Sequence, residues 1–146
     1  MSKKVYVSLI ADLLHAGHIN ILKEAAKFGE VTVGLLTSTA IHELNDTVYL
    51  KYKQRLEVIQ NLNMVSDIVP QEDASYKNNL IRIKPDYVVH GDDWIDNRQS
   101  KYREEVINLL SEWGGKLIDV KYSTDISDKN LKNKLMKLGV TTVHRL

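Results

Sequence analysis

With 146 residues, the chain is long enough to bury the core of one domain and too short for several. Hydrophobic residues make up 43% and charged residues 27% of it, which is typical of a soluble globular protein and not of a disordered or membrane-spanning chain. The net charge of +1 excludes a strongly basic nucleic-acid or membrane binder, and the lack of cysteine and of a signal peptide favours a cytoplasmic protein without disulfides.

Strand and helix patterns alternate along the sequence. The β-branched run over 5–10 predicts a buried strand, and apolar residues at helical spacing from Ile19 to Ala26 predict a helix that Gly29 ends as its C′ residue. The further predicted elements are a strand over 31–36, a helix over 52–62, a strand over 67–70, one or two helical turns over 79–84, a strand over 86–90, a helix over 101–113, a strand over 116–122 and a last helix around 131–138.

This alternation predicts an α/β fold: a Rossmann-like three-layer sandwich with a five-stranded parallel sheet and helices on both faces. We expect one domain over 1–138 and a C-terminal tail over 139–146, at which a further domain could begin. The glycine-rich dinucleotide fingerprint and the P-loop motif are both absent from the sequence, so any phosphate site must use another device.

Three unusual segments each follow a predicted strand. Residues 15–18 follow the first strand, 91–94 the fourth and 123–127 the fifth. Since the carboxyl ends of parallel strands meet at one edge of the sheet, and ligands of such sheets bind beyond that edge, these segments predict a single binding site.

The segment His15-Ala16-Gly17-His18 has the chemistry of a phosphate site. Gly17 lets the backbone approach a ligand, the start of a helix supplies N–H groups, and the imidazoles can donate hydrogen bonds to phosphate oxygens. Two structural alternatives are a zinc half-site and a pair of helix-capping histidines. Zinc is disfavoured because cysteine is absent and the other histidines, His42, His90 and His144, show no ligand spacing. We interpret these three histidines as structural or exposed.

The run Ala11-Asp12-Leu13-Leu14-His15-Ala16-Gly17-His18, together with Gln54-Arg55 and Gly91-Asp92-Asp93-Trp94, resembles the HxGH nucleotidyltransferases, and most of all their cytidylyltransferase branch. The residues Leu9-Ile10-Ala11-Asp12 are similar to those of cytidylyltransferase domains that accompany phosphoenolpyruvate mutase in phosphonate biosynthesis. The resemblance implies an enzyme of class EC 2.7.7 that transfers CMP from CTP to a small hydroxyethyl- or aminoethylphosphonate and releases pyrophosphate. Its alternatives are transfer to glycerol 3-phosphate, phosphocholine or phosphoethanolamine, or a degenerate, non-catalytic nucleotide-binding domain.

The resemblance also implies roles for single residues. Those implied to be catalytic are His15, His18 and Arg55. Those implied to bind the nucleotide are Leu9, Ile10, Ala11, His15, Gly17, His18, Gly91, Asp92, Asp93, Ile126 and Ser127. Those implied to bind the acceptor are Asp12, Arg55 and Trp94. It further implies Mg²⁺ carried mainly on the CTP phosphates without protein ligands, a homodimer, a possible phosphoenolpyruvate mutase domain as partner, and no nucleic-acid or membrane contact.

Several of these residues also have plain structural interpretations. Asp12 could form a turn, Arg55 could be an exposed helix arginine, Trp94 could be core, and Ser127 could cap the last helix. The segment Thr124-Asp125-Ile126-Ser127-Asp128-Lys129 departs from the family's final motif, because aspartates stand where relatives carry a glycine and a hydroxyl. The stretch 44–47 lacks the lysine that relatives often carry after the second strand.

Overall fold

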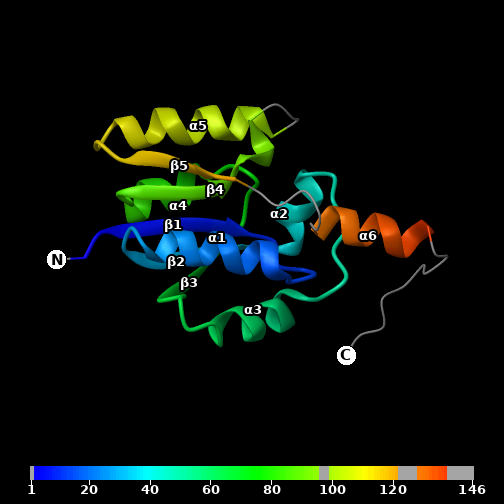
Figure 1. The fold of residues 1–146 in the computed structure, drawn as a ribbon. Helices are drawn as coiled ribbons and strands as arrows, with labels where there is room; N and C mark the ends of the chain where they lie inside the picture. The colour runs from blue at the N-terminus through cyan, green and yellow to red at the C-terminus, as the bar shows by residue number, and fades with distance from the viewer. Residues whose placement is uncertain (1, 96–98, 122–127, 138–146) are drawn as a thin grey trace.

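A computed structural model describes residues 2–95, 99–121 and 128–137, and in the last range the side chains of 133–137 (Figure 1). In chain order the elements are β1 (Lys4–Leu9), α1 (Ala16–Ala26), β2 (Glu30–Leu36), α2 (Ser38–Glu43), α3 (Tyr52–Gln60), β3 (Asp67–Gln71), α4 (Lys77–Ile83), β4 (Tyr87–Gly91), the 3₁₀ turn η1 (Asp92–Trp94), α5 (Ser100–Ser111), β5 (Lys116–Val120) and α6 (Asp128–Lys137).

The five strands form one parallel sheet in the order β3-β2-β1-β4-β5. The central strand β1 pairs with β2 on one side and with β4 on the other, in registers such as Val7 with Val33 and Tyr6 with Val88. The strand order therefore reverses between β1 and β4, and the α/β fold with a five-stranded parallel sheet is confirmed.

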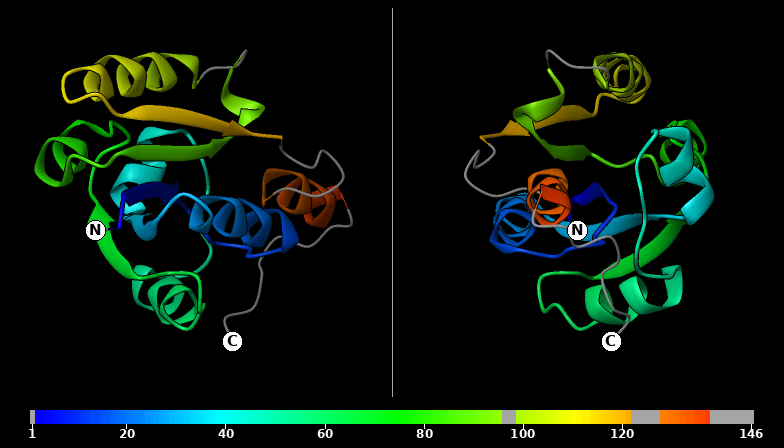
Figure 2. Two further views of the ribbon diagram at one scale, coloured as in Figure 1. Left: turned by 60° about the vertical axis from the view of Figure 1, so that its left-hand side comes forward. Right: turned by 90° about the vertical axis from the view of Figure 1, so that its right-hand side faces the viewer.

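Helices cover both faces of the sheet, with α3 and α5 on opposite sides of the molecule (Figures 1 and 2). On one face, Val5, Val7 and Leu9 pack against α1 and α3. On the other face, Tyr6 and Val88 pack against α4 and α5. Side chains of β1 thus pack into the core on both faces of the sheet, as those of strands in parallel sheets usually do.

A buried tyrosine ties β1 to β3 and α4. The Tyr6 hydroxyl donates to Oε1 of Gln71 at 2.6 Å and accepts from Nδ2 of Asn79 at 3.0 Å. Burial raises the pKa of Tyr6 far above its usual value, so the phenol stays neutral. Gly34 lies on the neighbouring strand β2, paired with Ser8, and any Cβ there would overlap the Tyr6 hydroxyl.

Two features of the connections differ from the sequence prediction. The prediction omits α2, which is short and buries only Ala40 and Ile41, too few apolar residues to show a helical period. The prediction that Gly29 ends α1 is wrong, since the helix ends at Ala26 with Lys27 as its C-cap. Gly29 has no left-handed conformation; it is needed because its backbone lies against the carbonyl oxygen of Lys3.

The remaining differences concern the ends of elements. α4 begins at Lys77, two residues before the predicted start, and α5 ends at Ser111, two residues before the predicted end. The predicted tail 139–146 lies outside the described residues. Within the described part of the chain, no helix is both long enough and apolar enough to cross a bilayer.

Candidate functional site

Two of the three segments singled out in the sequence meet at the carboxyl edge of the sheet. Residues 15–18 follow β1 and residues 91–94 follow β4, and these strands are hydrogen-bonded neighbours at the point where the strand order reverses. This point is where open parallel sheets bind ligands. The third segment, 123–127, with the predicted nucleotide contacts Ile126 and Ser127, lies outside the described residues.

His15 and His18 cap the first turn of α1. His15 is the N-cap, and its Nδ1 accepts a hydrogen bond from the Gly17 amide at 3.0 Å. In return, Nδ1 of His18 accepts from the His15 amide at 3.1 Å. The two rings lie 4.1 Å apart, centroid to centroid, and are tilted by 50°. The capping interpretation of these histidines is therefore confirmed, and it leaves the far nitrogen of each ring available for another role.

These hydrogen bonds determine which ring nitrogen carries the proton. An Nδ1 that accepts from an amide has no proton of its own, so the neutral ring is protonated on Nε2 and is a donor there. Burial lowers the pKa of His15, and burial with the neighbouring His15 lowers the pKa of His18 from 6.5 to about 4. At neutral pH both rings are therefore uncharged Nε2–H donors.

One of these donors has no partner. Nε2 of His15 is fully shielded by the surrounding protein atoms and makes no hydrogen bond to any described residue. Unpaired buried donors are costly, and in native structures they usually mark a site whose partner is a ligand or a water molecule. The HxGH segment therefore combines two hydrogen-bond donors with the positive end of α1.

The backbone between β1 and α1 is strained at Ala11. This buried alanine has φ = 54°, in the left-handed region that residues with a Cβ seldom adopt. The predicted nucleotide contacts Leu9 and Ile10 lie directly before it, at the end of β1. Strained backbone of this kind is held in place by its surroundings, and here two buried polar side chains supply the restraint.

The first of these side chains is Arg55, on α3. It is completely buried, and its guanidinium donates to the carbonyl oxygens of Ile10 at 2.9 Å, Leu36 at 2.6 Å and Leu50 at 3.1 Å. The ring of Tyr52 lies 5.6 Å from it. Arg55 thus joins the carboxyl ends of β1 and β2 to the segment before α3, and it is not the exposed helix arginine of the structural alternative.

The second is Asp12, only 1% exposed. Its carboxylate oxygens accept from the amides of Tyr49 and Leu50, each at 2.8 Å. Asp12 and Arg55 thus hold the same segment, one through its N–H groups and the other through a carbonyl oxygen. Direct contacts of Asp12 with an acceptor and of Arg55 with phosphate stay predictions.

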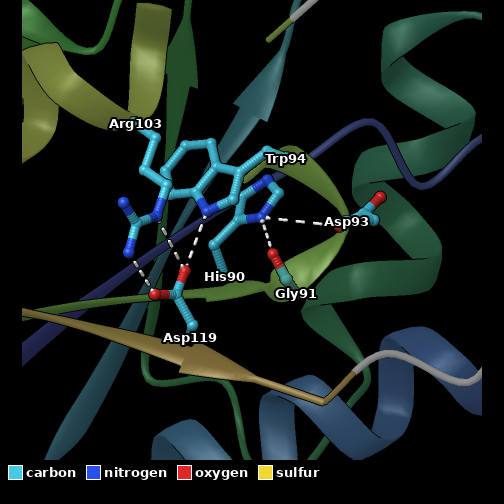
Figure 3. A network of polar contacts seen from close by, with 6 residues as sticks. All are labelled: His90, Gly91, Asp93, Trp94, Arg103 and Asp119. Atoms are coloured by element: carbon cyan, nitrogen blue, oxygen red, sulfur yellow. Dashed lines mark hydrogen bonds and ion pairs between the residues drawn. The ribbon is translucent and has the colours of Figure 1, made fainter. Parts of the chain in front are cut away.

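The second half of the site is the turn that follows β4 (Figure 3). Gly91 is buried, Asp92 is half-buried, and Asp93 is exposed. Trp94 is only 1% exposed; its ring stacks on His90 at 3.7 Å with 9° between the planes. Its Nε1 donates to Oδ1 of Asp119 at 3.0 Å. Trp94 is therefore a core residue of this half, and its contact with an acceptor stays a prediction.

The sequence does not indicate two members of this half, Arg103 and Asp119, and it predicts a third, His90, only as structural or exposed. Nδ1 of His90 lies 2.6 Å from the carbonyl oxygen of Gly91, and Arg103 contacts both carboxylate oxygens of Asp119, at 2.7 and 3.3 Å. The carboxylate of Asp119 has a lowered pKa through its bonds to Arg103 and Trp94, which outweigh its burial. The only signal in the sequence is an aspartate within the apolar strand β5, where a charge needs a partner.

The described residues offer no protein cage for a metal ion: within 2–95, 99–121 and 133–137, no three His, Asp or Glu side chains gather in a way that could hold one. The Asp12 carboxylate, which is nearest in sequence to the histidines, accepts two backbone hydrogen bonds instead.

The sequence is similar to those of known proteins. Residues 10–134 match the family model described as "Cytidylyltransferase-like". The chain is 29% identical over 94 residues to glycerol-3-phosphate cytidylyltransferase of Bacillus subtilis, covering 63% of this chain and 73% of that protein. It is 30% identical over 97 residues to FAD synthase of Methanopyrus kandleri, covering 64% of this chain and 65% of that protein, just under two thirds of its length.

The fold has relatives among solved structures. A lipopolysaccharide core biosynthesis protein from Thermoplasma volcanium superposes with a TM-score of 0.70 and 23% identity, over 84% of this chain and all of that one. At this identity the likeness extends to the fold alone.

Proposed function

Since this chain belongs to the cytidylyltransferase-like family of nucleotidyltransferases, we propose that it transfers CMP from CTP to a small phosphorylated acceptor and releases pyrophosphate. One observation carries the proposal: His15 and His18 form a pair of neutral Nε2–H donors at the start of α1, and Nε2 of His15 has no partner among the residues that the structure describes. Triphosphate oxygens are the acceptors that such a site lacks.

The proposed reaction needs positioning and charge stabilisation more than proton transfer. An oxyanion of the acceptor attacks the α-phosphorus of CTP, the new O–P bond forms, and the bond to the β-phosphate oxygen breaks with pyrophosphate as the leaving group. The imidazole donors stabilise the negative charge on the α-phosphate oxygens in the transition state. Because both rings are already neutral and held by backbone amides, their tautomer need not change to do so.

In this proposal the cytosine base binds at the turn Gly91–Asp93. This turn follows β4, on the other side of the strand-order reversal from the histidines, which follow β1. Mg²⁺, when bound on the phosphate oxygens, would supply further charge neutralisation. The acceptor is a small molecule with a phosphate or phosphonate oxyanion. Glycerol 3-phosphate, named in one relative, leads the phosphomonoesters, and the phosphonates expected from residues 9–12 are the second group to test.

The decisive experiment measures pyrophosphate release by the purified chain with Mg²⁺. Each of CTP, ATP, UTP and GTP is paired with glycerol 3-phosphate, phosphocholine, phosphoethanolamine, 2-aminoethylphosphonate and 2-hydroxyethylphosphonate. We expect release that requires both CTP and one acceptor, at least about tenfold faster than with ATP, because a pocket that hydrogen-bonds one base edge leaves polar groups unpaired with another.

The other outcomes are equally informative. A thermal shift with CTP but no pyrophosphate with any acceptor would make the chain a non-catalytic nucleotide-binding domain. A preference for ATP would contradict cytidylyl transfer and favour the chemistry of relatives such as FAD synthase. Release with a phosphonate alone, and with no phosphomonoester, would support the phosphonate acceptor.

A further inference from the structure

A chain of contacts runs from α5 and β5 to the turn after β4 (Figure 3). Arg103 on α5 grips both carboxylate oxygens of Asp119 on β5. Asp119 accepts from the indole N–H of Trp94, the last residue of η1. Trp94 stacks on His90, and His90 in turn bonds the carbonyl oxygen of Gly91. The turn is thereby held at Gly91, where it begins, and at Trp94, which follows Asp93.

The direction of each hydrogen bond follows from the partner. A carbonyl oxygen only accepts, so Nδ1 of His90 carries a proton and donates to Gly91. An indole N–H only donates, so buried Trp94 requires an acceptor, and Asp119 is the one it has. A carboxylate between a buried donor and a guanidinium fork has a single good orientation. Each contact therefore restricts the next one.

We propose that Arg103 and Asp119 are positioning residues for base selection: through Trp94 and His90 they hold the turn Gly91–Asp93 in the shape that favours cytosine over adenine. The inference rests on the proposed function, which assigns the base to this turn. Neither Arg103 nor Asp119 contacts the nucleotide in this proposal. Their effect is on how sharply the turn is held, because hydrogen-bonding groups discriminate between base edges only when they stay within about half an ångström of the right position.

The competing explanation is that the network only stabilises the fold, and the chain offers matched controls for that. Trp113 is a second tryptophan whose indole N–H bonds a protein acceptor, the carbonyl oxygen of Pro85 at 2.8 Å, next to the amino end of β4. Glu105 lies on α5 like Arg103, and its carboxylate accepts from Ser75 and Tyr76. It is the nearer of the two controls, because the Tyr76 ring packs 5.7 Å from the Trp94 ring. We expect loss of either control contact to weaken packing while keeping the hydrogen bonds of Trp94 and His90.

The experiment compares Asp119→Asn and Trp94→Phe with Glu105→Gln and Trp113→Phe. Thermal melting first establishes that all four variants fold. For the first pair we expect KM for CTP to rise and the ratio of kcat/KM for CTP over ATP to fall, each by about tenfold, the effect of losing one good hydrogen bond. With saturating CTP, kcat of Asp119→Asn should stay within about threefold of wild type, because the histidine donors are untouched. The second pair should keep the wild-type ratio.

Rescue tests the chain of contacts further. Arg103→Lys keeps the charge but loses the bidentate contact with Asp119. Its ratio of kcat/KM for CTP over ATP should therefore lie between that of wild type and that of Arg103→Met. The inference is overturned if Asp119→Asn and Trp94→Phe keep the wild-type CTP-to-ATP ratio, as the controls do, or if Asp119→Asn lowers kcat instead of raising KM. Failure of the proposed function looks different, because then the wild-type chain itself would release no pyrophosphate from CTP with any acceptor, or would prefer ATP.

Discussion

Each half of the site contains a pair of packed rings, His15 with His18 in the first half and His90 with Trp94 in the second. The histidines of the two halves use Nδ1 in opposite ways, as acceptor in the first half and as donor in the second. His15 and His18 accept at Nδ1 and carry a proton at Nε2, and within the described part of the chain Nε2 of His15 has no hydrogen-bond partner. His90 donates at Nδ1 to its own chain and is stacked flat on Trp94. The first half thus has a hydrogen-bond donor for a ligand, whereas the N–H groups of His90 and Trp94 in the second half bond protein acceptors and hold a turn. Residues of the first kind should affect chemistry, and residues of the second kind stability and selectivity.

The largest effect is expected from Arg55→Met, which tests whether Arg55 belongs to the holding kind. The change leaves the carbonyl oxygens of Ile10, Leu36 and Leu50 without this donor in a buried place. We expect a loss of about 4 kcal/mol in the free energy of unfolding, measured in urea. The matched control is Arg82→Met, an exposed arginine on α4 that bonds the Asn79 side chain. A stable Arg55→Met variant with a raised KM for the acceptor would instead support the predicted phosphate contact.

The next effect concerns the donors. His15→Ala and His18→Ala should each lower kcat by about two orders of magnitude, the usual effect of one transition-state donor, and should cost about 1 kcal/mol of stability through the lost capping bond. Steady-state pyrophosphate release and thermal melting measure the two quantities. His42→Ala, an exposed histidine on α2, serves as the control. Retained activity with a large fall in melting temperature would reduce the histidines to helix caps.

The pH dependence of the free energy of unfolding tests whether His18 is neutral in the folded protein. The folded pKa of His18 is about 4, below the 6.5 of the unfolded chain, so the unfolded state binds the proton first as the pH falls. The stability contributed by neutral His18 is therefore fully present above pH 6.5 and is lost as the pH falls towards 4, by up to about 3 kcal/mol. Urea unfolding at several pH values should show this slope for wild type and a smaller one for His18→Gln. Equal slopes would contradict the assignment.

The smallest effect is expected from Asp12→Asn. The amide keeps one acceptor oxygen for the segment at Tyr49 and Leu50 but loses the other and the charge, which should cost about 1 kcal/mol. Hydrogen exchange should then show faster exchange of the amides of residues 49 and 50 than of residues in β2. If these amides are unaffected while the KM for the acceptor rises, the predicted acceptor contact of Asp12 would be supported.

The fold could be predicted because its signals are local. Strands such as 31–36 are short, largely apolar runs without helical spacing, and helices such as 101–113 repeat apolar residues at helical spacing. The alternation that defines a parallel α/β sheet is therefore visible in the sequence. The meeting of residues 15–18 and 91–94 followed from that topology alone. Short α2 was missed because a six-residue helix shows no period.

The side-chain arrangement could not be predicted, because it depends on contacts between distant residues. Nothing near Arg55 in sequence indicates that Ile10, 45 residues away, is its partner, and Asp119 meets Trp94 across 25 residues. Motif positions do not separate a side chain that holds the backbone from one that holds a ligand; burial and hydrogen bonding do. The homodimer, the mutase partner and the roles of Ile126 and Ser127 stay predictions.

The packing of Tyr6 against Gly34 has a consequence for how this sequence can change over evolutionary time. The phenol occupies the space that any side chain at position 34 would need, so the two positions are not free to drift independently. A substitution at 34 becomes tolerable only after the ring at 6 has shrunk, and then Gln71 and Asn79 lose the hydroxyl between them. Among descendants of this chain, positions 6, 34, 71 and 79 should therefore co-vary as a group, in the order that the ring changes first.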